Sequence, residues 1–156
     1  MGFPLTIAGT VKLAAATPGQ ASDLAEQLAK ALIANRATDV RSSGNSVTFR
    51  GGMFRFVTNW NLLVPVTSGT ITVASGSPGS VDYCFSCMQM LIFATAFSLL
   101  VLVFFASPPR APLAFDLLAP IGAWAWLFGA NYLLAYFRLS GFIRDVIAGS
   151  TTLVSD

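Results

Sequence analysis

The sequence of 156 residues contains no histidine, few charges and only two cysteines. Without histidine the chain lacks the side chain most often used as a general base and as a metal ligand near neutral pH. Charged residues make up 10% of the chain, whereas a soluble domain has about a quarter. The seven acids are scattered, and there is no glycine-rich phosphate loop and no nucleophile-and-base pair. We therefore expect no catalytic site and no cofactor, and the net charge of +2 excludes a strong nucleic-acid footprint.

Hydrophobic residues account for 54% of the chain and are concentrated in its second half. Residues 88–106 carry no charge, and at about 1.5 Å per helical residue they cover the thickness of a hydrocarbon core. A second uncharged stretch covers 117–137, and three prolines between the two stretches end the first helix. The pattern predicts a two-helix transmembrane hairpin over residues 87–137.

The charges that flank the two stretches predict the orientation of the hairpin. Arg138 and Arg144 follow the second stretch, whereas the connecting loop offers only Arg110 against Asp116. The positive-inside rule then places the residues before and after the hairpin in the cytoplasm. We expect an integral membrane protein of the bacterial inner membrane, with both termini cytoplasmic.

Residues 1–86 have their own periodicities and are predicted to form a separate α+β domain. Apolar residues alternate over 5–13, which is typical of a strand with one buried face. Leu24, Leu28 and Leu32 recur at helical spacing, with Ser22 as the predicted N-cap and residues 17–20 as the break before it. An antiparallel meander of about four strands follows. Its last strand leads almost directly into the first span, so this domain is expected to lie against the membrane surface.

Turn residues and apolar pairs predict a register for the first part of the meander. Gly51-Gly52 and Ser68-Gly69 are both interpreted as two-residue hairpin turns. In that register, apolar residues lie opposite apolar residues across both turns. The predicted pairs are Phe49 with Phe54, Val47 with Phe56, Val66 with Ile71, and Val64 with Val73.

The loop over residues 75–79 predicts the rest of the register. A five-residue loop places Val73 opposite Val81 and Ile71 opposite Tyr83, whereas a four-residue loop would place Val73 opposite Asp82. We therefore predict the longer loop. Residues 53–67 form either one long bent strand or two strands with a break at residues 59–61.

The segment 138–156 is predicted to be a short amphipathic helix and a tail. Its apolar residues share one helical face, and this indicates a helix lying on the membrane or against the sheet domain. The alternative is an extension of the second span into the cytoplasm. The residues of this face are Leu139, Phe142, Ile143, Val146 and Ile147.

Cys84 and Cys87 form the one motif with chemical potential, a C-x-x-C at the start of the first span. We interpret them as two small, largely buried residues at the membrane boundary. The alternatives are a redox dithiol or half of a zinc site completed by a second subunit. The sequence pattern of a soluble alternating α/β fold, in which redox dithiols of the thioredoxin type occur, is absent.

Two further groups of residues are candidates for contacts. Arginines near the Gly51-Gly52 turn can attract anionic lipid or a protein partner, and they are Arg36, Arg41, Arg50 and Arg55. Small and polar residues inside the spans favour close helix packing. These are Thr95, Ser98, Gly122, Ala123, Ala130 and Asn131.

Together these features predict a small non-enzymatic membrane protein. We expect a scaffold or accessory subunit that self-associates and whose cytoplasmic domain contacts a protein partner or anionic lipid. The alternatives are a membrane-bound redox or metal protein that uses Cys84 and Cys87, and an oligomeric channel or effector.

Overall fold

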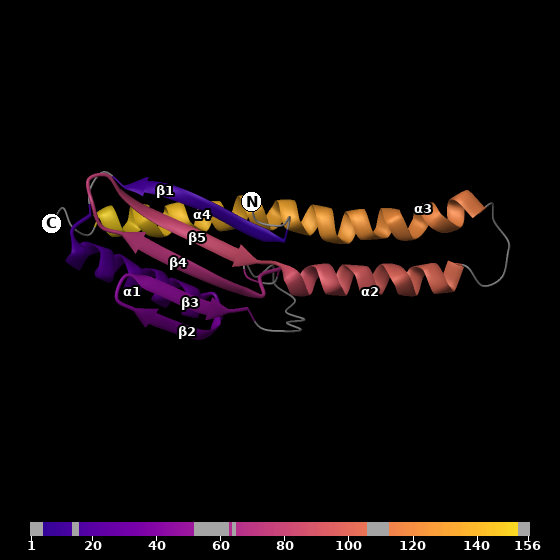
Figure 1. Cartoon of the computed structure of the whole chain (residues 1–156), viewed down its shortest axis with the longest axis horizontal. Helices are drawn as coiled ribbons and strands as arrows, with labels where there is room; N and C mark the ends of the chain where they lie inside the picture. The colour runs from indigo at the N-terminus through magenta and orange to yellow at the C-terminus, as the bar shows by residue number, and fades with distance from the viewer. Residues whose placement is uncertain (1–4, 14–15, 52–62, 64, 106–112, 153–156) are drawn as a thin grey trace.

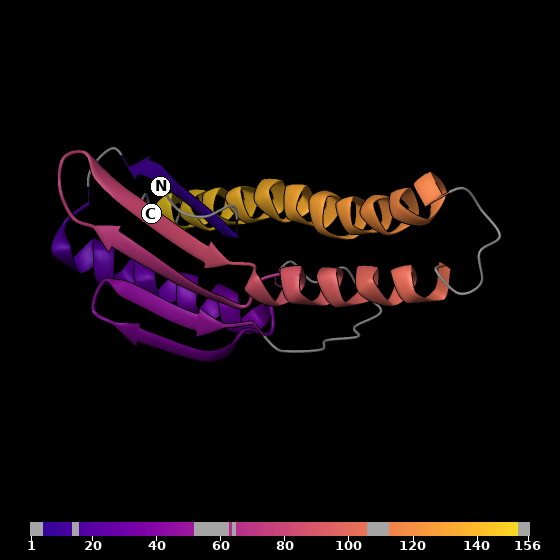
Figure 2. The same cartoon turned by 45° about the vertical axis from the view of Figure 1, so that its right-hand side comes forward.

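The chain folds into a five-stranded antiparallel sheet with one helix packed on it, and two long helical rods leave the sheet side by side (Figure 1). This computed structural model describes residues 5–13, 16–51, 63, 65–105 and 113–152. The rods remain adjacent when the molecule is turned (Figure 2). We call the sheet, its helix and the part of the second rod that packs on them the head.

The sheet has the strand order β1-β5-β4-β3-β2, so the first strand along the chain pairs with the last. Every neighbouring pair is antiparallel. The expected α+β domain with one strand, one helix and four further strands is therefore confirmed. The strands are β1 (Thr6–Leu13), β2 (Thr38–Ser43), β3 (Ser46–Arg50), β4 (Ser68–Ala74) and β5 (Gly79–Ser86), and the helix after β1 is α1 (Pro18–Ala34).

The predicted register between β4 and β5 is confirmed. Val73 lies opposite Val81, and Ile71 lies opposite Tyr83. All four side chains point to the buried face, since alternate residues of a strand share a face. The apolar alternation therefore fixed this hairpin.

The predicted pairing across Gly51-Gly52 is wrong. Both edges of β3 are occupied, one by β2 and the other by β4, so Phe49 lies opposite Gly69 and Val47 opposite Ile71. Neither edge of β3 is therefore left for the predicted partner strand after Gly52. The residues proposed as partners, Phe54 and Phe56, and most of the predicted strand 53–67, Val64 included, lie outside the described residues.

The predicted turn at Ser68-Gly69 is also wrong, because both residues lie within β4. Ile71 pairs with Val47 and Tyr83, and Val66 precedes the strand in a turn in which its N–H donates to the carbonyl of Leu63. The strand that replaces the missing partner is β2. Its sequence TDVRSS has only one half-buried position, Val40, so hydrophobic alternation gave no signal for it.

The N-cap of helix α1 lies five residues before the predicted cap at Ser22. Thr17 is the N-cap, and its hydroxyl accepts from the Gln20 N–H at 3.4 Å while the Gln20 side chain accepts from the Thr17 N–H at 3.0 Å. This reciprocal capping box satisfies two backbone donors. Pro18 takes the first helical position, where its missing N–H costs nothing. The segment read as a break is therefore the start of the helix.

The core lies on one face of the sheet, and two helices cover it. The buried side of α1 presents Leu24, Leu28 and Leu32 to β2, β3 and β4. The end of the second rod contributes Leu139 and Ile143, both completely buried in the same cluster. The sheet contributes Ile7, Val47, Phe49, Ile71, Val73, Val81, Tyr83 and Phe85.

The first rod is α2 (Met88–Phe105), and the second is a continuous helix made of α3 (Leu113–Trp124), a π-helical turn η1 (Ala125–Ala130) and α4 (Asn131–Thr152). The separate short helix expected over 138–156 does not form, because α4 passes through Arg138 without a break. The alternative prediction, in which the second apolar stretch continues as a helix beyond Arg138, agrees with the structure. The apolar face of this extension packs on the head core rather than standing free.

The junction between the head and α2 is short and hydrogen-bonded. Cys87 alone separates β5 from α2, and its N–H donates to the carbonyl of Leu5 at 2.8 Å. The Gln89 N–H, in the first turn of α2, donates to the hydroxyl of Thr67 at 2.9 Å. Such a cap supplied by a distant residue fixes the helix start to the head.

Within the described residues, one helix is long and apolar enough to cross a membrane by length and composition, the stretch Leu118–Ser150. Of the 18-residue stretch with the highest hydropathy in this helix, only 11% is buried inside the protein. The apolar helix Met88–Phe104 lies beside it and is shorter.

Candidate functional site

The face of the sheet opposite the helices is uncovered and polar. Because side chains alternate along a strand, the residues between the buried ones point to this side. They are short hydroxyl residues with a few charges, and we call this side the open face. Its members include Thr10, Lys12, Thr48, Arg50, Ser68, Thr70, Thr72, Ser80, Asp82, Cys84 and Ser86.

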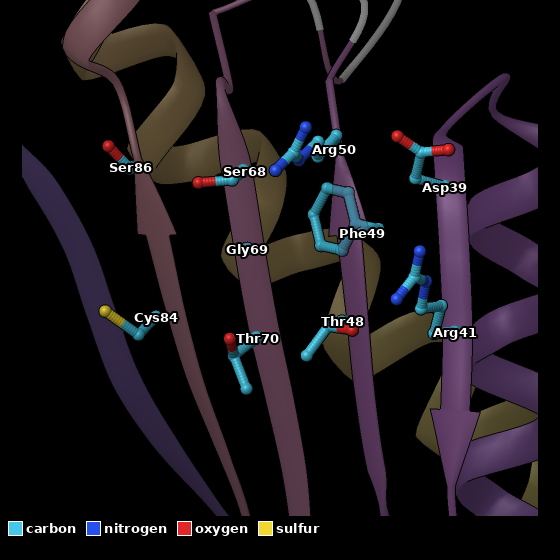
Figure 3. Close-up of a pocket in the computed structure, with 10 residues that line it drawn as sticks. All are labelled: Asp39, Arg41, Thr48, Phe49, Arg50, Ser68, Gly69, Thr70, Cys84 and Ser86. Carbon is cyan, nitrogen blue, oxygen red and sulfur yellow. The ribbon is translucent and has the colours of Figure 1, made fainter.

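A groove of about 540 Å³ lies on the open face. It is lined by side chains from four strands, β5, β4, β3 and β2 (Figure 3). It lies at the end of the sheet nearest α2, since Ser86 is the last residue of β5. The lining residues are Asp39, Arg41, Thr48, Phe49, Arg50, Ser68, Gly69, Thr70, Cys84 and Ser86.

The register arranges the polar lining in two rows across the strands. The row nearer to α2 runs from Ser86 to Ser68 to Arg50, which are direct partners. The next row runs from Cys84 to Thr70 to Thr48 to Arg41, again through direct partners. Each row thus combines small side chains with one guanidinium at its end.

The charges in the groove are two arginines and one carboxylate. Arg41 and Arg50 are exposed, and no described residue forms an ion pair with either. In Figure 3 the Arg50 side chain lies between Ser68 and Asp39, while Arg41 rises from β2 beneath Asp39. Asp39 has a positive φ of 50° at the irregularity between Thr38 and Arg41 in β2. The groove therefore has a formal net charge of +1 from Arg41, Arg50 and Asp39.

The hydroxyl groups of the groove are free to bind a ligand. Among the described residues none accepts from or donates to the hydroxyls of Ser68, Thr70, Thr48 and Ser86, whereas other hydroxyls on the sheet are already used. Thr10, for example, donates to Asp82, and Thr38 donates to the carbonyl of Arg50 at 2.9 Å. Hydroxyls and guanidinium groups are donors suited to an oxyanion.

The structure brings together two of the four arginines singled out from the sequence. Arg41 and Arg50 line the groove, while Arg36 lies outside it in a left-handed conformation just after α1. Arg55 lies outside the described residues. Sequence reasoning missed the hydroxyl rows and Asp39, because β2 and the start of β4 were not recognised as strands. The sequence pattern that could have indicated the open face is the polar residue at every second position of β5, from Ser80 to Ser86.

The two cysteines do not form a joint site. Cys84 is exposed on the open face, whereas Cys87 is completely buried, and both are free thiols. A spacing of three along an extended segment places the two side chains on opposite faces. Burial raises the pKa of the Cys87 thiol to about 11, so it stays protonated and unreactive near neutral pH. Within the described residues no cluster of three or more Cys, Asp or Glu is placed to hold a metal ion.

We expect a thiol reagent to modify one cysteine per folded chain at pH 8. With a pKa of about 11, only about a thousandth of Cys87 is thiolate at that pH, and the side chain is buried as well. Cys84 is accessible. Mass spectrometry after maleimide treatment should show one adduct, which Cys84→Ser removes and Cys87→Ser leaves. Two adducts on the folded chain would contradict this arrangement.

Polar residues of the rods form hydrogen bonds between the two helices. The indole N–H of Trp124 donates to the Thr95 hydroxyl at 3.1 Å, and the Ser98 hydroxyl donates to the carbonyl of Pro120 at 2.7 Å. Asn131 is exposed instead, and its amide donates to the Leu127 carbonyl of its own helix at 2.6 Å. Gly122 is exposed, and Ala123 and Ala130 are half-buried. Thr95 and Ser98 therefore lie at the contact between the rods, and Gly122 and Asn131 do not.

No protein-family model matches the sequence, and no curated protein and no solved structure matches it either.

Proposed function

We propose that the protein is a non-enzymatic integral membrane scaffold or accessory subunit. In this proposal α2 and the neighbouring part of the second rod cross the bilayer as a hairpin. The head stands on the cytoplasmic surface and contacts a protein partner or anionic lipid. Copies of the chain associate through the rods.

The observation that carries the proposal is the apolar surface of the rods. Nearly all large hydrophobic side chains that are strongly exposed in the described residues belong to them, Ile33 of α1 being the exception. Phe104, Trp126 and Phe137 are 73%, 75% and 68% exposed. An apolar surface of this extent needs lipid or a partner to cover it. A core helix of a soluble protein would be mostly buried, and the second rod is not.

The lengths and contacts of the rods support a hairpin. The 18 residues of α2 extend about 27 Å at 1.5 Å per residue, close to the ~30 Å hydrocarbon core. The second rod runs beside α2 over this length (Figures 1 and 2) and is bonded to it through Thr95 and Ser98. The second rod continues into the head core, so the chain returns to the end of the rods at which α2 begins.

The charge distribution supports a cytoplasmic head. Arg138 and Arg144 lie on the head side of the second rod, and the head also carries Lys12, Lys30 and the groove arginines. Between the two apolar stretches, over residues 107–116, the sequence has Arg110 against Asp116. Lysine and arginine are retained on the cytoplasmic side of inner-membrane proteins.

One exposed feature of the rods supports self-association. Gly122 has no atom within 4 Å of the position where a Cβ would stand, so its surface is open to close approach by another helix. The disposition of Cys84 and Cys87 on opposite faces gives no support to the redox or metal alternative.

Cysteine accessibility in oriented membrane vesicles tests the proposed topology. A membrane-impermeant maleimide should label Cys84 in inside-out vesicles and leave it unlabelled in right-side-out vesicles. A variant combining Cys84→Ser with Ser107→Cys should show the opposite pattern. Labelling of both positions from one side, or release of the protein by an alkaline wash, would contradict a hairpin anchor. A purely monomeric mass in mild detergent would contradict self-association.

A further inference from the structure

We propose that the groove binds the headgroup of a monoanionic phospholipid, with the phosphodiester in the row nearer to α2. The inference rests on the proposed membrane anchorage and adds to it a defined site and a ligand class. It differs from a general attraction between basic residues and lipid, because it assigns binding to two arginines and the hydroxyls between them.

The position of the groove relative to α2 is the first argument. Ser86 lies two residues before Met88, where the apolar helix begins, and two extended residues span at most about 7 Å. The headgroup layer of one leaflet is about 5–7 Å thick, half the difference between the whole bilayer and its hydrocarbon core. The row of Ser86, Ser68 and Arg50 is therefore level with lipid phosphates, and the junction at Cys87 keeps it there.

The charge of the groove is the second argument. Arg41 and Arg50 against Asp39 leave one positive charge, which matches a lipid of charge −1 and gives no preference for a zwitterionic lipid. Within the described part of the chain neither arginine forms an ion pair, and the ion pair found there joins Lys30 and Glu26. A guanidinium can donate to two phosphate oxygens at once. Such a contact fixes the position of the phosphate, which attraction to a positively charged surface alone does not.

The hydroxyls provide the third argument, since they favour a hydroxylated headgroup. Ser68 and Ser86 lie in the row of Arg50 and can donate to phosphate oxygens. Thr48 and Thr70 lie one row further from the membrane, beside Arg41, where the distal part of the headgroup would lie. A glycerol headgroup presents hydroxyls there, whereas a choline headgroup presents methyl groups and a positive charge. Phosphatidylglycerol is therefore the appropriate probe.

The test uses the full-length protein in neutral detergent, titrated with phosphatidylglycerol or with phosphatidylcholine of the same acyl chains. Bound lipid is counted by native mass spectrometry. Wild type should prefer phosphatidylglycerol. Because each arginine near an anionic surface contributes a factor of about five, Arg41→Gln with Arg50→Gln should weaken that binding about 25-fold. Asp39→Asn should strengthen it, which gives an effect in the opposite direction that a folding defect cannot imitate.

The matched control removes two charges elsewhere on the head, Lys12→Gln with Arg144→Gln. Lys12 is on the same open face but at the end of β1 far from Ser86, and Arg144 is exposed on α4. The control should retain the preference for phosphatidylglycerol. Equal loss in both double variants would overturn the proposal, because the preference would then reflect overall charge.

Two further results would also overturn it. If the groove variant keeps wild-type lipid selectivity, the groove does not hold the headgroup. If millimolar inorganic phosphate displaces phosphatidylglycerol completely, the site binds a soluble anion rather than a lipid. Failure of the membrane anchorage itself is distinguishable, since the wild-type protein would then stay monodisperse in buffer without detergent.

Discussion

Replacing both Leu139 and Ile143 with alanine is expected to unfold the head while leaving the contact between α2 and α3 in place. Both side chains are completely buried in the cluster that also holds Ile7, Leu28 and Phe85. Each large-to-small change in a core costs about 2–5 kcal/mol. The sum approaches the whole stability of a typical domain, about 5–15 kcal/mol. The two residues are one helical turn apart, so their separate costs will not add exactly.

Thermal unfolding in detergent and limited proteolysis measure this effect. The double variant should lose the cooperative transition of the head and expose the strands to protease. The control is Leu133→Ala with Leu134→Ala, on the same rod but 57% and 42% exposed. It should leave the transition nearly unchanged. Equal transitions in both variants would mean that α4 does not complete the head core.

The role of Leu139 and Ile143 marks one limit of sequence reasoning. The helical spacing of these apolar residues was visible, and it correctly indicated a helix with one buried face. The same face fits a lipid surface and a sheet surface equally well, because both are apolar. What decides between them is the uncovered half of the sheet at β1 and β5, which exists only after the strands have paired.

The β4–β5 hairpin was predictable in detail because its signals are local. Apolar residues alternate with polar ones on both strands, Ile71 and Val73 on β4 and Val81, Tyr83 and Phe85 on β5, and turn residues lie between the strands. The neighbours of β3 were not predictable in the same way. The partner β2 is polar and exposed, so in the sequence the apolar residues of β3 indicate an apolar partner later in the chain. In the structure those side chains are covered by α1, and the apolar residue opposite Val47 is Ile71 of β4.

The groove could not be predicted for the same reason. Its two rows exist only in the register that joins β2, β3, β4 and β5, whereas the sequence pattern predicts no strand at β2 and a turn at the start of β4. Arg41 and Arg50 were singled out as cations near a turn. Their shared place beside the hydroxyls of Ser68 and Thr70 depends on strand pairing over long sequence distances.

Gly69 is the residue at which the turn prediction failed, and its replacement by valine is expected to destabilise the head strongly. Glycine is a turn residue when it supplies a positive φ, but Gly69 has no such conformation and lies within β4. A Cβ at this position would stand 2.5 Å from Cε1 of Phe49 and closer still to Cδ1 of Phe85. The two rings, whose centroids are 5.7 Å apart, therefore occupy the space of the missing side chain.

The cost follows from the immobility of those rings. Phe85 is fully buried and also stacks on Tyr83, with centroids 5.3 Å apart, so neither ring has free volume to move into. Overpacking by an extra methyl group costs about 1–3 kcal/mol, and the branched side chain of valine is expected to exceed that range. Gly69→Ala should give the smaller effect of the two, so the pair forms a graded series.

Gly19→Ala is the control for the loss of glycine itself. Gly19 lies in the first turn of α1, and a Cβ there would meet no atom within 4 Å. This change should stabilise the head by about 0.4–1 kcal/mol, because alanine restricts the unfolded chain and fits the helix. Denaturant unfolding of the detergent-solubilised protein measures all three variants. Gly69→Val with wild-type stability would mean that Phe49 and Phe85 do not pack over this position. The glycine would then mark a turn after all, and the register that forms the groove would be wrong with it.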